Sequence, residues 1–232
     1  MIDVHGLTKT FGNGVHAVNG VDFSVAPGEI VGFLGANGAG KTTTMRMLTT
    51  LLTPTSGTAA IAGHDLLSDP RGVRRSIGYV SQSGGINPVN PLGDELELQA
   101  MLYGMRRREA RARITETLET LRLTGMENLP GGALSGGQRR RFDIAFSLLH
   151  RPPVLFLDEP TTGLDPQSRA ELWEHIRSLG LTVFLSTHYL EEAEALCDRL
   201  LVIDSGRIAA QGTPAEIKGE RTLTEAFMEI AS

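Results

Sequence analysis

The stretch that decides the fold reads Gly35-Ala36-Asn37-Gly38-Ala39-Gly40-Lys41-Thr42, and it directly follows the apolar run Ile30-Val31-Gly32-Phe33-Leu34. That run has the length and composition of a buried strand. Behind the glycines, apolar residues recur at helical spacing from Met45 until Pro54, which cannot continue a helix. The stretch therefore predicts a strand, a glycine-rich loop and a helix in succession.

The same eight residues match the pattern G-x-x-x-x-G-K-[ST], which binds phosphate when it joins a strand to a helix. Glycines let backbone N–H groups turn toward a phosphate, and the helix N-terminus adds partial positive charge. A flexible glycine loop with an incidental lysine is the alternative. We expect Lys41 to supply charge, Thr42 to bind Mg²⁺ and Thr43 to add a phosphate contact. The expected cofactor-binding set is Gly35, Asn37, Gly38, Gly40, Lys41, Thr42 and Thr43.

A second apolar run, Val154-Leu155-Phe156-Leu157, ends in the two acids Asp158 and Glu159. Open α/β sheets hold their ligands at the carboxyl ends of strands, and acids buried there need a cation or a catalytic task. An ordinary acidic turn at the end of a strand is the alternative. Together with the glycine loop, the pattern predicts that Asp158 holds Mg²⁺ through its water shell and that Glu159 polarises an attacking water.

The composition is that of an ordinary folded protein, with 41% hydrophobic and 21% charged residues. A formal net charge of -5 provides no global field for nucleic acid. The arginine runs at 106–108 and 139–141 lack interleaved aromatic residues, so we expect them to lie on helix faces or to contact a protein partner. No nucleic-acid binding is expected.

Cysteine usage and hydropathy indicate the compartment. Cys197 is the only cysteine, which excludes an intrachain disulfide and a cysteine-rich zinc site. The N-terminus lacks a basic start followed by an apolar stretch, and no segment approaches the roughly 18 uncharged apolar residues of a membrane span. We expect a cytoplasmic chain that is neither secreted nor embedded in a membrane.

Residues 134–138, Leu134-Ser135-Gly136-Gly137-Gln138, resemble the signature sequence of the ATP-binding cassette (ABC) family. A serine hydroxyl and two glycines ahead of a helix suit phosphate binding, although a plain helix-capping turn has the same composition. Other residues match the family's pattern in its order along the chain. They are Phe11 as the adenine-stacking aromatic, Gln82 as the glutamine loop, Asp165 as the D-loop and His188 as the switch histidine.

The resemblance implies a fold, a site and partners. The fold class is α/β, with a phosphate-loop NTPase core and mainly parallel sheet, an N-terminal antiparallel β subdomain and an inserted helical signature subdomain. One domain over 1–232 would comprise a nucleotide-binding core at 1–86 and 150–220, a helical subdomain at 87–149 and a C-terminal helix at 221–232. The cofactors would be ATP and Mg²⁺. The partners would be a second copy, joined through a nucleotide sandwich, and a separate transmembrane permease, which would hold this chain at the cytoplasmic side of the plasma membrane.

The implied roles extend to individual residues. Glu159, His188 and Gln82 would be catalytic, and Thr42, Gln82 and Asp158 would bind the metal. Further nucleotide contacts would come from the signature residues Ser135, Gly136, Gly137 and Gln138, and from Phe11 and Asp165.

Within the family, the chain looks most like bacterial drug-export ATPases of the daunorubicin-resistance type, on the basis of residues 135–145, 158–166 and 222–227. This implies export of a drug, lipid or similar hydrophobic compound. A non-transport ABC ATPase that remodels a soluble complex and an importer ATPase are the alternatives. Two segments depart from the family's pattern, a short connection at 177–182 and residues 88–99, which lack the usual threonine-arginine-glutamate-asparagine sequence.

Overall fold

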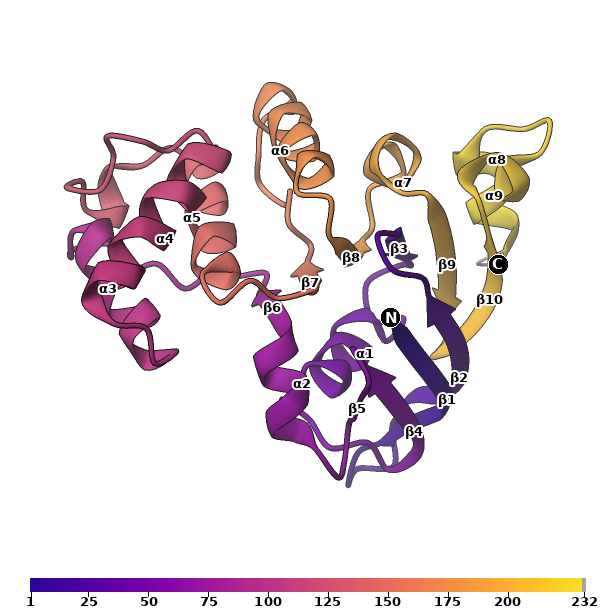
Figure 1. Cartoon of the computed structure of the whole chain (residues 1–232). Coiled ribbons are helices and arrows are strands. Elements are labelled where there is room, and N and C mark those ends of the chain that lie inside the picture. Colours follow the sequence, from indigo (N-terminus) through magenta and orange to yellow (C-terminus); the bar gives the residue numbers. More distant parts are fainter. Residues whose placement is uncertain (231–232) are drawn as a thin grey trace. The chain divides into compact units, whose positions relative to one another are not determined.

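The computed structural model describes residues 1–230, which form two compact units that we treat separately (Figure 1). The core unit comprises Met1–Ile77, Pro153–Glu159 and the described chain from Leu181 onward. The helical unit comprises Gly78–Pro152 and Pro160–Gly180. Stretches distant in the sequence therefore build each unit.

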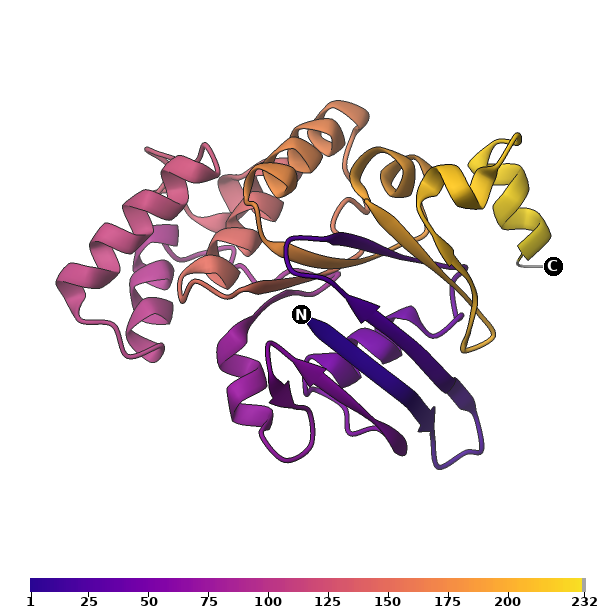
Figure 2. The ribbon, with the colours of Figure 1, turned by 45° about the vertical axis from the view of Figure 1, so that its right-hand side comes forward.

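The first sheet of the core unit is antiparallel, and its strands lie side by side in the order β2-β1-β4-β5 (Figure 2). Ile2 pairs with Val25 on one side and with Ile61 on the other. Buried and exposed residues alternate at the start of the first strand, as expected for a sheet with one face on the core. The strands are β1 (Ile2–Thr10), β2 (His16–Val25), β4 (Ser56–Ile61) and β5 (His64–Asp65).

The second sheet carries the predicted buried strands. Within the core unit its order is β10-β9-β3-β8-β7, with parallel pairing throughout except between β9 and β10. Every residue of β3, β7 and β8 is buried, which explains why these strands read as unbroken apolar runs. The strands are β3 (Ile30–Leu34), β7 (Val154–Asp158), β8 (Thr182–Thr187), β9 (Arg199–Asp204) and β10 (Arg207–Gly212). The predicted fold class is confirmed.

Four phenylalanines join the two sheets of the core unit. Phe184 of β8 stacks on Phe23 of β2, with ring centroids 5.4 Å apart, and contacts Phe33 and Phe156 at 5.4 and 5.7 Å. Such ring pairs add about 0.5–1.5 kcal/mol each beyond the area they bury. The cluster therefore fixes the strands whose carboxyl ends carry the candidate site.

Helices cover the parallel sheet of the core unit. Helix α1 packs against β7 and β8, and α7 packs against β3 and β8. The core-unit helices are α1 (Lys41–Leu48), α2 (Pro70–Ser76), α7 (Leu190–Leu196), α8 (Pro214–Lys218) and α9 (Leu223–Ile230). The C-terminal helix predicted over 221–232 corresponds to α9, and its last two residues lie outside the described part.

Two turns of the core unit bear on the sequence predictions. Helix α1 ends at Leu48, before Pro54, because Thr50 takes a left-handed backbone with φ 62°. Ser205 and Gly206 form the tight hairpin turn between β9 and β10, with φ of 46° and 76°. Positive φ at both central positions is the turn that matches the twist of paired strands.

The helical unit packs its helices in sequence, α3 on α4, α4 on α5 and α5 on α6. Ile114, Leu118 and Leu121 recur at helical spacing and are buried, so they form one buried face. None of the helices described in residues 1–230 is both long and apolar enough to cross a bilayer. The elements are α3 (Leu92–Leu102), α4 (Arg107–Thr120), the short 3-10 turn η1 (Gly131–Ala133), α5 (Gly136–Leu148) and α6 (Pro166–Ser178), with β6 (Ile77–Val80) at the boundary.

The predicted domain bounds concern how parts of the chain would work together. The two units reflect how the described residues pack, and they place α6 with α3, α4 and α5. The bounds 1–86 with 150–220, 87–149 and 221–232 therefore stay a prediction about function.

Candidate nucleotide-binding site

The carboxyl ends of β3, β7 and β8 meet at one edge of the parallel sheet. Leu34 pairs with Thr187, and Asp158 pairs with Ser186. The residues that follow these strands, among them Glu159 and His188, therefore leave the sheet at the same edge. This is where open α/β sheets bind their ligands.

The loop between β3 and α1 requires glycine at particular positions. Gly40 has φ 110°, and a Cβ there would lie 2.5 Å from the carbonyl oxygen of Ala17. A Cβ on Gly35 would lie 2.5 Å from the carbonyl oxygen of Ile203. Gly38 has φ 85°, a left-handed conformation that costs other residues strain. The loop is therefore a tight backbone turn at the start of a helix, as phosphate binding needs.

Lys41 is buried at 5% exposure and lies among oxygen atoms. Its Nζ donates to the carbonyl oxygens of Gly35 and Ala36 at 2.9 and 3.1 Å, and it lies 3.6 Å from Oε1 of Glu159. Burial lowers the pKa of Lys41, and the carboxylates of Glu159 and Asp158 oppose that shift. The side chain is thus held at the loop as a point charge.

Asp158 and Thr42, two of the three predicted metal ligands, are hydrogen-bonded to each other. Asp158 is 2% exposed, accepts a hydrogen bond from Oγ of Ser186 at 2.5 Å and is hydrogen-bonded by Thr42. Burial raises the pKa of Asp158, and the nearby charge of Glu159 raises it further. A neighbouring charge of opposite sign would therefore stabilise this carboxylate.

The donor set fits Mg²⁺. In the described part of the chain, no group of three or more His, Cys, Asp or Glu side chains forms a protein cage for a metal. Mg²⁺ is usually bound by one or two carboxylates together with substrate phosphates and water. One carboxylate and one hydroxyl beside a phosphate loop match that chemistry.

Glu159 turns into the same edge through an unusual backbone conformation. Its φ is 47°, and its N–H donates to both the carbonyl oxygen and the Oγ of Ser186 at 3.1 Å. Left-handed backbone at a residue other than glycine costs about 1–3 kcal/mol and is found where the surroundings enforce it. Oε1 of Glu159 lies 3.3 Å from Nδ1 of His188, at ion-pair distance but outside hydrogen-bond geometry.

The remaining predicted residues of the core unit lie on its surface or in the loop. Phe11 is 39% exposed, in a turn closed by hydrogen bonds between Phe11 and Val15 and between Gly14 and Phe11. Nζ of Lys9 lies 5.6 Å from its ring centroid. Asn37 is exposed and Thr43 is half-buried. Phe11 therefore presents an aromatic face, as adenine stacking needs.

Ser135 begins the signature helix α5 in the helical unit. Its hydroxyl accepts from the N–H of Gln138 at 3.2 Å, while its own N–H donates to Oε1 of Gln138 at 2.9 Å. A Cβ on Gly136 would lie 3.2 Å from Leu164, and one on Gly137 would lie 3.1 Å from Ser168. The capping turn considered as the alternative is therefore present, and Ser135 is also exposed at a helix N-terminus.

Asp165 and Gln82 complete the predicted set. The Asp165 carboxylate caps α6, accepting from the N–H and the Oγ of Ser168 at 3.0 and 2.7 Å. These bonds lower the pKa of Asp165. Gln82 is exposed in the loop that follows β6. The core unit thus assembles the loop, Asp158, Glu159 and His188, while Gln82, residues 135–138 and Asp165 belong to the helical unit.

The arginine run at 139–141 differs from its prediction. Arg140 is buried at 7% exposure, and Arg141 donates to the carbonyl oxygen of Leu121 and lies 3.3 Å from Nε2 of His175. Arg140 is internal, so its prediction as a helix-surface residue was wrong, whereas Arg141 is half-buried. The signal that could have found Arg140 is an acid, Asp143, one helical turn later among apolar residues.

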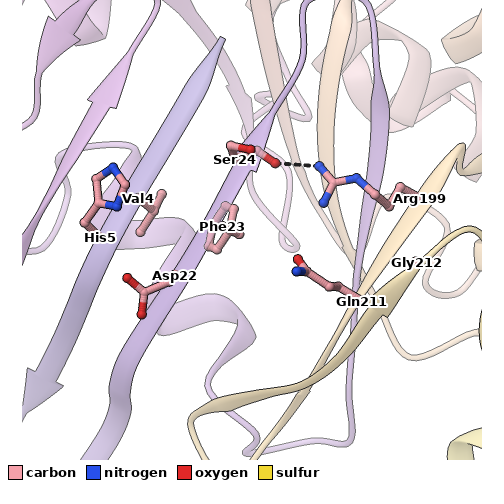
Figure 3. A pocket seen from close by; sticks show the side chains of 8 residues that line it. All are labelled: Val4, His5, Asp22, Phe23, Ser24, Arg199, Gln211 and Gly212. Carbon is pink, nitrogen blue, oxygen red and sulfur yellow. Dashed lines mark hydrogen bonds between the residues drawn. The ribbon is translucent and has the colours of Figure 1, made fainter.

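A pocket of the core unit lies away from the predicted site and holds none of its residues (Figure 3). It has a volume of about 480 Å³ and is lined by His5, Asp22, Arg199 and Gln211 among others. Arg199 already binds Glu29 and the carbonyl oxygen of Ser24, and Asp22 accepts from the N–H of Gly6. The charges of this pocket are therefore used within the fold.

Known proteins resemble the chain over most of its length. The ABC transporter family matches residues 18–162. The doxorubicin resistance ATP-binding protein DrrA of Mycobacterium tuberculosis is 47% identical over 93% of this chain and 66% of its own length. The Nod factor export ATP-binding protein I of Ralstonia nicotianae is 44% identical over 94% of this chain and 68% of its own. The chain thus spans about two thirds of the length of these curated relatives.

A solved structure agrees with these relatives. The ATP-binding cassette MJ0796, solved as a dimer in a post-hydrolysis state with ADP and Pi, is 27% identical and superposes with a TM-score of 0.82. The match covers 92% of this chain and 98% of that one. With its phosphate loop, its acids at the strand ends and its signature turn, the chain belongs to the ABC transporter family, as an ABC ATPase domain.

Proposed function

We propose that the chain is the ATP-hydrolysing subunit of a bacterial ABC exporter that moves a drug, lipid or similar hydrophobic compound through a separate permease. The observation that carries the proposal is the meeting of Lys41, Asp158, Glu159 and His188 beside a phosphate loop at one sheet edge. Two copies would bind two ATP molecules with Mg²⁺, close, hydrolyse and reopen.

Each side chain has a task suited to its surroundings. Lys41 and the N–H groups of the loop neutralise phosphate, and Thr42 and Asp158 hold Mg²⁺, with Gln82 of the helical unit as a further ligand. Bound Mg²⁺ supplies charge that stabilises the transferred phosphoryl group. Glu159 orients and polarises the attacking water. His188 contacts the γ-phosphate from the same sheet edge, and Phe11 stacks on adenine.

The helical unit supplies the second half of each nucleotide site. Residues 135–138 form the N-terminus of α5, where Ser135 and Gly136 are exposed, and such a helix end binds anions. We propose that it contacts ATP held by the loop of the other copy, with Asp165 at the same interface. The dimer named for the similar cassette MJ0796 supports this arrangement.

Export and a permease partner follow from the relatives and from one surface. Both curated relatives carry names that refer to drug resistance or export. Four apolar side chains at the end of α3 and just beyond it are exposed, namely Leu98, Met101, Leu102 and Tyr103. An apolar patch of this kind marks an interaction site more often than a free surface. We propose that the permease binds here and holds the chain at the cytoplasmic face of the plasma membrane.

Capture from membranes tests the transporter part. The tagged chain, purified from detergent-solubilised membranes of its native cell, should bring down a polytopic permease without a solute-binding protein, as mass spectrometry would show. Leu98→Glu with Leu102→Glu should lose the permease, because a charge cannot be buried against an apolar partner. Leu67→Glu, at an exposed leucine of the core unit, is the matched control and should keep it.

The other outcomes decide between the alternatives. A permease together with a solute-binding protein would favour an importer. Ribosomal or only soluble partners would favour a non-transport ABC ATPase that remodels a soluble complex. Either result would overturn the exporter proposal and leave the ATPase chemistry intact.

A further inference from the structure

The loop that carries Gln82 is held at both ends by the signature helix α5. Nη1 of Arg140 donates to the carbonyl oxygen of Ser81 at 2.7 Å, directly before Gln82. Oδ1 of Asp143 accepts from the N–H of Gly85 at 2.9 Å, a few residues after it. Two side chains one helical turn apart therefore fix the backbone on either side of the glutamine.

Close packing reinforces these two bonds. Gly84 has φ 69°, and a Cβ on it would lie 2.7 Å from Oδ2 of Asp143. The Gly84 backbone thus rests directly on the carboxylate, which leaves no room for a side chain. The backbone of residues 84 and 85 therefore packs closely against the carboxylate of Asp143.

Arg140 reaches a second segment of the helical unit. Its Nε donates to the carbonyl oxygen of Pro160 at 2.7 Å. Pro160 follows Glu159 in the chain, so a single guanidinium binds the backbone directly before Gln82 and the backbone directly after Glu159. A planar fork with several donors suits arginine and not lysine for this task.

Burial of the charged pair Arg140 and Asp143 costs desolvation free energy. Arg140 and Asp143 are 7% and 9% exposed, and their charged atoms lie 3.8 Å apart. Burial raises the pKa of Asp143, against the opposing effects of Gly85 and Arg140. Apolar side chains of similar size are often as good or better for stability at such positions. A buried pair that binds three backbone groups therefore fixes geometry more than it adds stability.

We propose that Arg140 and Asp143 are positioning residues that lock the Gln82 loop to the signature helix, so that displacement of Gln82 at the metal and displacement of the signature are one motion. This rests on the proposed function for the role of Gln82. Arg140 and Asp143 thereby join the Gln82 loop to the signature helix inside one copy of the chain.

Asp143→Ala tests the lock because the backbone group that Asp143 binds belongs to the loop, whereas Arg140 also binds the carbonyl oxygen of Pro160. It should lower kcat for ATP about tenfold or more while KM for ATP changes by less than about threefold, since misplacement costs rate more than ground-state binding. Asp143→Asn keeps an acceptor for the Gly85 N–H and should recover most of the rate. Arg108→Gln, an exposed arginine of the same unit, is the matched control and should match wild type.

Two further readouts separate positioning from general damage. Hydrogen exchange of the peptide over 81–86 should rise in Asp143→Ala and stay near wild type in Asp143→Asn, whether or not ATP is hydrolysed. In a double variant with Gln82→Ala, the Asp143→Ala change should reduce kcat no further. If Asp143→Ala does not fold, Gly84→Ala displaces the loop from the other side and should give the same exchange and rate changes.

The outcomes are distinct. Unchanged exchange in 81–86, or rate losses that multiply in the double variant, would overturn the lock. A wild-type chain that hydrolyses no ATP, with or without its membrane partner, would overturn the proposed function instead, and the exchange measurement would still decide whether Asp143 holds the loop.

Discussion

Two glycine-containing turns of this chain lead into helices that we assign to phosphate binding, and they are built differently. In the part of the chain that the structure describes, no side chain caps the first turn of α1. The first turn of α5, in contrast, has a complete capping box between Ser135 and Gln138. A helix N-terminus without a side-chain cap keeps its N–H groups for an anion, while a capped one has already used some of them.

The surroundings of the two turns differ in the same direction. Beside α1, the buried charges of Lys41, Asp158 and Glu159 make a site within one unit of a single chain. Beside the exposed Ser135, the capping box satisfies the first turn of α5 with the protein's own hydrogen bonds. The phosphate loop is therefore built as a primary site. Under the proposed function, the signature turn would offer its hydroxyl and its helix dipole to the nucleotide of a second copy.

The largest effect is expected from a variant that abolishes ATP hydrolysis and leaves both turns intact. Glu159→Gln keeps the size of the side chain and loses its ability to take a proton. We expect kcat for ATP to fall about a hundredfold or more, with ATP affinity retained. The variant should accumulate as a closed dimer with ATP, measured by size-exclusion chromatography and steady-state ATPase assays.

Glu194→Gln is the matched control, an exposed glutamate of the core unit that pairs with Lys218. It should leave turnover and oligomeric state as in wild type. Wild-type turnover in Glu159→Gln would remove this residue from its catalytic role and shift the search for the base to His188.

Ser135→Asp tests whether the signature turn contacts phosphate in addition to capping α5. Aspartate caps helices as well as serine does, so the free energy of unfolding should stay within about 0.5 kcal/mol of wild type. Its negative charge would face the γ-phosphate of the partner's ATP and should weaken the ATP-induced dimer about tenfold or more. Analytical ultracentrifugation in the Glu159→Gln background measures the dimer, and urea unfolding measures stability.

Two companion variants separate capping from phosphate contact. Ser135→Ala should cost about 1 kcal/mol of stability through loss of the cap. Thr213→Asp alters the equivalent capping box of α8, outside the proposed dimer contacts, and should not affect dimerisation. Dimer formation by Ser135→Asp at wild-type ATP concentrations would mean that the turn is a helix cap and nothing more.

The difference between the turns also explains what the sequence could predict. The strand, loop and helix of residues 30–48 follow one another in the sequence, and the glycines and the lysine of the loop indicate its backbone conformation. The fold class and the phosphate loop could therefore be predicted. The left-handed backbone of Glu159 could not be predicted, because it depends on a hydrogen bond to Ser186, which lies in a neighbouring strand that is distant in the sequence. Local patterns cannot report a contact that the fold creates.

The arginine run at 139–141 shows the same limit. Three consecutive arginines predict a solvated face, and Arg139 is indeed exposed. Arg140 points inward because the carbonyl oxygens of Ser81 and Pro160, from two other segments, meet there. The roles given to Gln82 and Asp165 rest on the family's pattern and stay predictions.

The smallest expected effect concerns the buried acid beside the phosphate loop. Asp158 has a raised pKa in the fold, so the folded chain keeps its proton to higher pH than an unfolded aspartate, whose pKa is about 3.9. Stability is therefore lost as pH rises from that value through the folded pKa. Asp158→Asn accepts the same Ser186 bond without the charge and should be more stable by about 1 kcal/mol at neutral pH, while losing Mg²⁺-dependent hydrolysis.

Urea unfolding of both proteins at about pH 4.5 and about pH 7.5 checks the sign, since the gain should be larger at the higher pH. Asp204→Asn, a partly exposed acid at the end of β9, is the control and should change stability by less than about 0.5 kcal/mol. A gain for Asp158→Asn that Mg²⁺ with ATP removes would mean that wild-type Asp158 is strained until a cation arrives. A loss of stability at both pH values would mean that the carboxylate is satisfied by Ser186 and Thr42 alone, and the phosphate loop would then be as complete without its ligand as the signature turn.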